Sequence, residues 1–122
     1  MLSLSGDNVR IESYDFGVMV VNGKRYFRDL IITPSRIIEN WWRDEGHKLK
    51  LKDLKDLKDE EFDILIVGTG YNGLMKVERE VLEEYKRKGV EVIAKPTREA
   101  VEEYNKAIRS GKRVVGAFHL TC

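Results

Sequence analysis

Three glycines in the middle of the chain have the spacing of a phosphate-binding loop. Gly68, Gly70 and Gly73 follow the apolar run 64–67, in the order Gly68-Thr69-Gly70-Tyr71-Asn72-Gly73. Backbone N–H groups in such a loop, placed between a strand and a helix, can surround a phosphate or another small anion. One interpretation is therefore a small-anion pocket formed by Gly68, Thr69, Gly70 and Tyr71, with His119 from the last predicted strand nearby.

The other parts of a dinucleotide site are missing. An NAD-binding unit has an acidic residue about 20 residues beyond the glycines, at the end of the next strand. That place reads Ala94-Lys95-Pro96. The following helix is predicted to begin only near Val77 or Glu78, several residues past the last glycine. A tight structural turn explains the glycines better than a nucleotide does, and we expect no cofactor.

The histidines and the single cysteine are too few for a typical zinc site. His47, His119 and Cys122 offer at most three donors, whereas zinc takes four, or three and a water. On an extended strand, positions 119 and 122 point to opposite faces, which also argues against a nucleophilic Cys–His pair. We expect no metal and no catalytic residue.

The adjacent tryptophans are candidates for a contact surface. If Trp41-Trp42-Arg43 is extended, one ring faces the core, the other faces outward, and Arg43 shares a face with Trp41. An exposed tryptophan beside an arginine suits a protein contact. The candidate interaction surface is Trp41, Trp42, Arg43 and His47, and the competing interpretation is that both rings are buried.

The first half of the chain is predicted to be rich in strands. Asn22-Gly23 between residues 14–21 and 24–27 is a strong hairpin signal, because both turn positions need positive φ. Residues 30–33 and 37–43 are predicted to be further extended segments. The leucine repeat in residues 49–59 indicates a short helix with one apolar edge.

The second half alternates strands with helices. Strands are expected at residues 63–67, 90–94 and 113–120. Between them lie two apolar stripes at helical spacing, the first ending at Gly89 and the second beginning at a Thr97 cap and ending at Gly111. The stripes consist of Val77, Val81, Leu82 and Tyr85, and of Ala100, Val101, Tyr104, Ala107 and Ile108. Helical crossovers of this kind predict a largely parallel sheet.

Composition limits the remaining possibilities. A chain of 122 residues is one domain in length, and we assign residues 1–122 to a single domain that is β-rich over 1–45 and β-α-β-α-β over 63–122. The formal charge of +1 favours neither nucleic acid nor a membrane surface. No apolar run reaches a bilayer's thickness, and the start lacks the pattern of a signal peptide. A single cysteine favours the cytoplasm, and the abundance of Lys, Glu and Arg without glutamine is typical of heat-adapted proteins.

The chain resembles the domain of unknown function family 498, from about Tyr14 to Cys122. The residues that carry the resemblance are Asp29-Leu30-Ile31-Ile32, Trp41-Trp42-Arg43, Gly46-His47, Ile66-Val67-Gly68-Thr69-Gly70, Thr97, Ala100-Val101, Tyr104-Asn105 and Phe118-His119-Leu120-Thr121-Cys122. The family's eukaryotic members include an adipogenesis-associated protein and a mitochondrial complex I assembly factor. The resemblance implies three layers around a mixed, mainly parallel sheet, with a β-hairpin region at one side. It supplies no catalytic residues.

Two functions from different classes remain. The first is a small non-catalytic interaction or assembly module that binds a protein partner through the Trp41–His47 region. The second is a pocket protein that binds a small anionic ligand at the Gly68–Gly73 loop, with weak turnover as an extension. The oligomeric state is left open.

Overall fold

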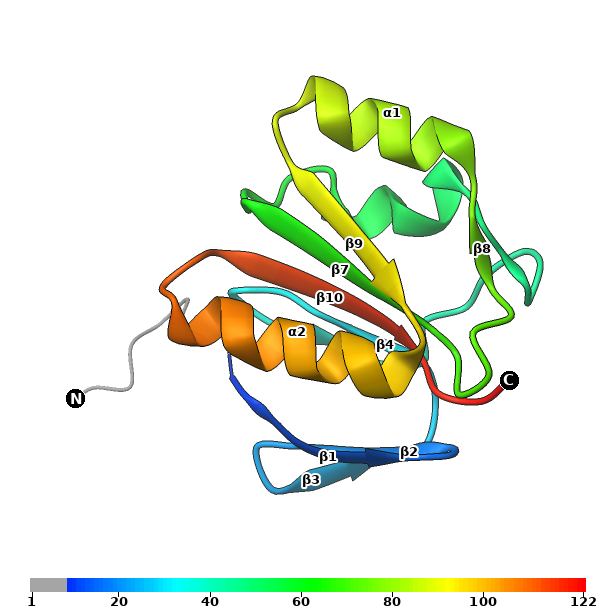
Figure 1. Cartoon of the computed structure of the whole chain (residues 1–122), viewed down its shortest axis with the longest axis vertical. Coiled ribbons are helices and arrows are strands. Elements are labelled where there is room, and N and C mark those ends of the chain that lie inside the picture. Colours follow the sequence, from blue (N-terminus) through cyan, green and yellow to red (C-terminus); the bar gives the residue numbers. More distant parts are fainter. Residues whose placement is uncertain (1–8) are drawn as a thin grey trace.

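The computed structural model describes residues 9–122 (Figure 1), so the predicted domain's residues 1–8 lie outside the described part. The chain begins with a three-stranded antiparallel meander of β1 (Ile11–Asp15), β2 (Val18–Val21) and β3 (Lys24–Tyr26). Asn22 at φ 52° and Gly23 at φ 80° confirm the hairpin turn. The segment 14–21, predicted as one strand, is two, because Gly17 at φ 77° turns the chain between β1 and β2.

The main sheet has five strands in the order β5-β4-β10-β7-β9. The bounds are β4 (Leu30–Ile32), β5 (Ile37–Ile38), β7 (Ile64–Thr69), β9 (Glu91–Lys95) and β10 (Val114–His119). β7 pairs in parallel with both β10 and β9, whereas β4 is antiparallel to β10 and to β5. The sheet is therefore mixed, and its central strand is β10.

Two hydrophobic clusters cover the two faces of this sheet. On one face, α2 (Thr97–Arg109) and the meander pack together over the sheet, around the buried rings of Tyr104 and Phe118. On the other face lie α1 (Arg79–Arg87) and a 3-10 helix, η1 (Leu51–Leu57), which bury Val81 and Leu54. The chain is thus a mixed α/β domain. Within residues 9–122, no helix has the length and apolar character needed to cross a membrane.

Four local predictions need correction. Val77 lies in the short strand β8 (Lys76–Val77), which pairs with β6 (Lys48–Leu49), and α1 starts two residues later. Leu82 is exposed on α1, outside the core stripe. Thr97 is the first helical residue and fully buried, and Pro96 holds the cap position. In residues 37–43 only β5 is a strand, because Asn40 at φ 54° redirects the chain before Trp41. The predicted helix ends at Gly89 and Gly111 are confirmed, and both glycines have positive φ.

Candidate functional site

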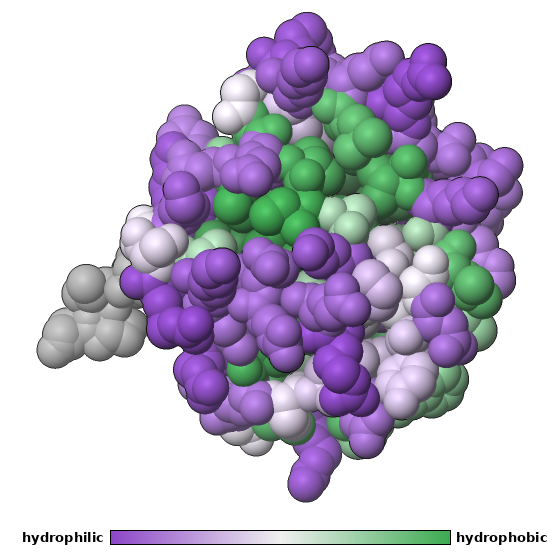
Figure 2. Space-filling model, viewed as in Figure 1, coloured by the Kyte–Doolittle hydropathy of each residue, from purple (hydrophilic) through white to green (hydrophobic). Residues whose placement is uncertain are grey.

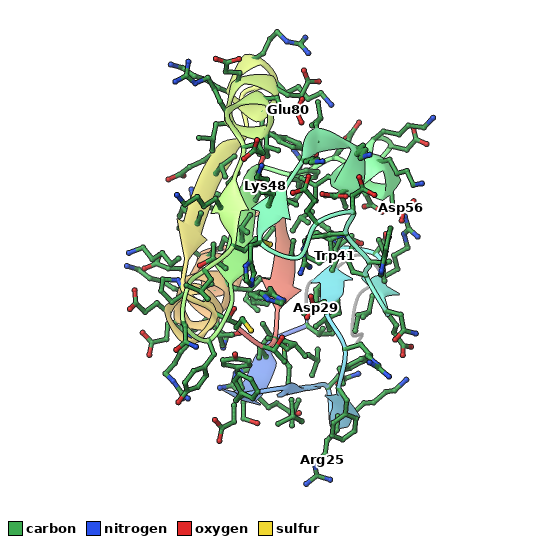
Figure 3. All side chains as sticks on the ribbon, turned by 90° about the vertical axis from the view of Figure 1, so that its right-hand side faces the viewer. Arg25, Asp29, Trp41, Lys48, Asp56 and Glu80 are labelled. Carbon is green, nitrogen blue, oxygen red and sulfur yellow. The ribbon has the colours of Figure 1, made fainter. Side chains whose placement is uncertain are left out.

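A buried charged cluster lies at the end of the central strand. His119 is the last residue of β10, and the register of β4 with β10 places Asp29 directly opposite it. Arg43 reaches the same point from the loop after β5. Figure 3 shows Asp29 beside Trp41 of the same loop, whose backbone N–H donates to the Asp29 carbonyl at 2.9 Å. Asp29 Oδ2 lies 2.8 Å from Arg43 Nη1 and 2.8 Å from His119 Nδ1. Arg43 is 8% exposed and His119 is 7% exposed, so the cluster is nearly sealed from solvent.

The proton on His119 can be assigned from these contacts. A carboxylate only accepts hydrogen bonds, so the short contact to Asp29 requires a proton on Nδ1. Arg43 Nη2 also lies 3.1 Å from Nδ1, but it cannot donate to a nitrogen that already carries a proton. Its acceptor is instead the carbonyl of Gly46, at 3.3 Å. The positive charge of Arg43 balances the negative charge of Asp29.

Asp29 is the centre of the cluster. Its second oxygen, Oδ1, accepts a hydrogen bond of 2.8 Å from the backbone N–H of Leu120. Burial alone would raise the pKa of Asp29, but hydrogen bonds from His119, the Leu120 amide and Arg43 outweigh it. The pKa of Asp29 is therefore lowered, and the side chain stays ionised at neutral pH.

An imidazole held by a carboxylate at Nδ1 is the arrangement found in general bases and metal ligands. Here the other ring nitrogen, His119 Nε2, is buried and has no hydrogen-bond partner among residues 9–122, and the same holds for Arg43 Nε. Asp29, Arg43 and His119 line none of three grooves found on the described part of the chain, which lie beside Phe62, Trp42 and Leu82. No group of three possible metal ligands occurs in residues 9–122. The cluster's evident action is to clamp three distant segments together.

The glycine loop binds the chain itself. Tyr71 N donates to the carbonyl of Thr121 at 2.8 Å, and Asn72 N and Leu74 N donate to that of Cys122 at 3.3 and 3.4 Å. Gly70 has φ 110°, and a Cβ there would lie 2.7 Å from the Thr121 carbonyl oxygen. Gly70 is thus required by the close approach of residues 121–122, and the N–H groups of Tyr71, Asn72 and Leu74 already have acceptors.

The side chain of Thr97 links the glycine loop to the end of β10. Its hydroxyl donates to the carbonyl of His119 at 2.6 Å and accepts from Gly70 N at 2.8 Å. A Cβ on Gly68 would lie 2.8 Å from that hydroxyl oxygen, so Gly68 is needed for packing. Thr69 is buried, as is His119, but the His119 side chain points to Asp29 and Arg43. The glycine loop and the His119 ring are therefore neighbours along the sheet edge, but the ring faces Asp29 and Arg43 and not the loop.

The ring of Tyr71 belongs to an aromatic cluster on the surface. It lies 5.5 Å from the ring of Phe16, edge to face, and 6.4 Å from that of Tyr14. The guanidinium of Arg98 stacks over both tyrosine rings, at 5.9 Å from Tyr14 and 5.6 Å from Tyr71. Tyr71 therefore stabilises the junction between the meander and the glycine loop.

The tryptophan pair has one ring in and one ring out. Trp41 is 6% exposed, and its indole N–H donates to the Asp53 carbonyl at 2.9 Å. The Arg43 guanidinium stacks on its ring at 4.8 Å, as the shared face predicted. Trp42 is 76% exposed. Of the predicted contact residues, only Trp42 and His47 are on the surface; Trp41 and Arg43 are buried supports.

Trp42 borders a groove of about 450 Å³ between the loop after β5 and the 3-10 helix. The other residues that line the groove are mostly charged or polar, with two apolar side chains. They are Ile38, Glu39, Asn40, Trp41, Asp44, Lys52, Asp53, Lys55 and Asp56. From the sequence, Asp29 was named only among the residues that carry the family resemblance, without a role in a site, and the groove was not predicted. The signal that could have indicated a role for Asp29 is its position as an acidic residue directly before the buried strand β4.

Residues 11–119 match the family described as "Protein of unknown function (DUF498/DUF598)". The chain belongs to this family. A solved structure of a conserved hypothetical protein from Pyrococcus horikoshii OT3 is similar to this DUF498 chain at 31% identity and a TM-score of 0.78, covering 93% of this chain and 99% of that one.

Two further structures show the same fold at lower identity. A protein from Bordetella parapertussis has a TM-score of 0.81 at 22% identity, with 98% of this chain and 99% of that chain covered. A Mth938-like domain from Bordetella pertussis has a TM-score of 0.73 at 21% identity, with 98% and 90% covered. The predicted family is thereby confirmed, as a family of unknown function with a shared α/β fold.

Proposed function

We propose that this DUF498 chain is a non-catalytic interaction module whose contact site is the groove beside Trp42. The observation that carries the proposal is the exposure of Trp42 between two buried neighbours. Trp41 and Arg43 are fixed by the Asp53 carbonyl and by Asp29, so the backbone at Trp42 is held between two anchors and its ring projects outward. A large aromatic ring on a backbone that is fixed before binding loses less entropy on contact, which is a property of interface hot spots.

The groove also defines the chemistry of the partner. An apolar or aromatic side chain of a partner protein would fill the space between Trp42 and Ile38. Around it the rim carries both signs of charge, with Lys52 and Lys55 beside Asp44 and Asp56. Asp44 is already paired with Lys52 at 2.8 Å, whereas neither side chain of Lys55 and Asp56 has an ion pair within the described residues. A matching partner surface therefore carries both an acid and a base around its apolar side chain.

The test compares wild type with Trp42→Ala, and uses Phe27→Ala as the matched control. Phe27 is 66% exposed but does not line the groove. Proteins captured by the immobilised full chain from a lysate of the source organism are then purified, and their affinities are measured with purified components. Trp42→Ala should weaken binding about thirtyfold, equivalent to about 2 kcal/mol, and Phe27→Ala should leave it unchanged.

A second readout separates the two rings. On binding, the indole N–H resonance of Trp42 should shift in a ¹H–¹⁵N spectrum, while that of Trp41, bonded to Asp53, should stay in place. The proposal is contradicted if Trp42→Ala leaves the affinity for every purified binder unchanged. It is equally contradicted if no protein binds with an affinity that depends on Trp42.

The anion pocket at Gly68–Gly73 is the weaker candidate, favoured by its place after a parallel strand and beside the start of α2. An anion would have to displace the carbonyls of Thr121 and Cys122 from Tyr71, Asn72 and Leu74. We expect millimolar inorganic phosphate or ATP to leave the melting temperature unchanged. A saturable increase of several degrees, by selective binding to the native state, would favour the pocket.

A further inference from the structure

Strand β9 forms one edge of the main sheet, and its outer side has no partner strand in residues 9–122. Glu91 N donates to the carbonyl of Asp63 at 3.1 Å, so the backbone groups of Glu91 point inward to β7. In a parallel pair the backbone N–H and C=O groups of successive residues point alternately to one side of the strand and the other. Those of Ile93 and Lys95 therefore also point to β7. The N–H and C=O groups of Val92 and Ala94 therefore point outward along the free edge.

The surface beside this edge is apolar. Figure 2 shows a continuous hydrophobic area between α1 and α2, where Figure 1 places β9. Leu82 of α1 is 43% exposed there, and Val90 and Val92 are half-buried. With Gly89 they line a shallow hollow of about 440 Å³. Edge strands with adjacent apolar surface are the common template for pairing with another chain.

The charges on β9 indicate which kind of chain would pair with its free edge. Its sequence is Glu91-Val92-Ile93-Ala94-Lys95, with an acid at one end and a base at the other. Both side chains are exposed, and neither forms an ion pair with the described residues. An antiparallel copy of this strand, centred on Ile93, sets Glu91 opposite Lys95 at both ends. A parallel copy would set like charges opposite each other, which is destabilising.

The hydrogen-bonding groups fit the same register. With Ile93 opposite Ile93 of a second copy, Val92 lies opposite Ala94, and these are the residues whose N–H and C=O groups face outward. Directly opposite residues that exchange both hydrogen bonds form the hydrogen-bonded pairs of an antiparallel ladder. Pro96, which has no N–H, ends the ladder on one side, and Val90, whose N–H donates to the Tyr85 carbonyl at 2.8 Å, ends it on the other.

We propose that β9 pairs antiparallel with β9 of a second copy of this chain, giving a two-fold symmetric dimer with a continuous ten-stranded sheet. The contact covers the apolar area of Leu82, Val90 and Val92, and forms two reciprocal ion pairs between Glu91 and Lys95. It uses a different edge of the sheet from the Trp42 groove, because β5, which leads to Trp42, is the opposite edge.

The test is a charge exchange measured by sedimentation equilibrium on the full chain. Wild type should form a species of twice 14.2 kDa. Glu91→Lys and Lys95→Glu each place two like-charged pairs across the two-fold axis, so each should raise the dimer Kd about tenfold or more. Asp59→Lys, an exposed charge change beyond the 3-10 helix, should leave the Kd unchanged.

Mixing the two single variants is the decisive measurement. One variant then carries bases at both positions and the other acids at both, so the heterodimer regains two opposite-charge pairs. The equimolar mixture should dimerise more strongly than either variant alone, and the double variant Glu91→Lys/Lys95→Glu should dimerise as wild type does. Circular dichroism of each variant establishes that it is folded.

Three results overturn the proposal. The first is a wild type that stays monomeric up to millimolar concentration. The second is a dimer whose Kd neither single variant changes, since another surface then forms the contact. The third is a mixture no more associated than the separate variants. Trp42→Ala should leave dimerisation unaffected, so the dimer proposal and the proposed contact site at the Trp42 groove are tested independently.

Discussion

Asp29 connects three segments that are far apart in the sequence. Its carboxylate receives hydrogen bonds from the loop after β5 through Arg43, from the end of β10 through His119, and from the backbone of Leu120. A buried charge with several donors is stable only while all partners are present. The cluster therefore fixes the segment that carries Trp42 onto the sheet.

Replacing Asp29 with Asn should lower the free energy of unfolding by about 3–5 kcal/mol at pH 7, because Arg43 is left buried without a counter-charge. The pKa of Asp29 is lowered on folding, so its contribution is complete above the unfolded value of about 3.8 and disappears as pH falls through the folded value. Urea unfolding of wild type and variant should therefore differ by a constant amount between pH 5 and 8 and converge in strong acid.

Asp44→Asn is the matched control, since this carboxylate is also paired but lies on the surface. Its effect should be much smaller and should fade in high salt, because exposed pairs are screened. Equal losses for the two variants would mean that the Asp29 cluster does not act as a buried unit.

The residues of the cluster were predictable from the sequence only in part. Arg43 and His119 were both predicted to be functional, but at different candidate sites, a contact surface and a ligand pocket. Their contact depends on the register of β4 against β10, a pairing of residues about ninety positions apart. Local periodicity carries no information on such pairings.

At the scale of elements, the turns and helices follow from local rules. Gly23→Val should lower the free energy of unfolding by about 1–2 kcal/mol, because a β-branched residue is forced to positive φ. Gly46→Val is the control, since neither glycine would place a Cβ within 4 Å of other atoms and only Gly23 has positive φ. Thermal unfolding measures both, and equal effects would remove the conformational explanation.

The glycine loop allows a second matched comparison. Gly70→Ala and Gly89→Ala both place a Cβ at positive φ, but only that on Gly70 meets the backbone of Thr121 and Cys122. Gly89→Ala should cost about 1 kcal/mol of unfolding free energy, and Gly70→Ala clearly more. In hydrogen exchange, Gly70→Ala should also expose the amides of Tyr71 and Leu74. Unchanged protection would show that residues 121–122 are not held by this loop.

Elements whose stability comes from distant contacts were predicted least well. The stripe of α2 was predicted well because thirteen residues of one helix repeat the same spacing, whereas in the nine-residue α1 only Val81 and Tyr85 of the predicted stripe are buried. β6 and β8 have two residues each and exist only because Lys48 and Leu49 meet Lys76 and Val77. Two residues are too few for any periodic signal, so Val77 was assigned to the following helix.

At the scale of the whole molecule, the two proposed contacts lie at opposite edges of one sheet. β9 forms one edge, and β5, which leads into the Trp42 loop, forms the other. A dimer through β9 would present two Trp42 grooves at its far ends. A partner with two copies of the matching segment would then bind more tightly through both than through one, without any new contact.

The central position of β10 has a consequence for how the chain folds. β4 and β7 do not pair with each other; each pairs with β10, whose residues lie about 50 to 90 positions further along the sequence. The loops that must close are long, so we expect slow folding with one cooperative transition rather than early formation of half a sheet. A chain that stops at Lys112 should show no protected sheet amides and a random-coil circular dichroism spectrum, because the strand that joins its two halves is absent.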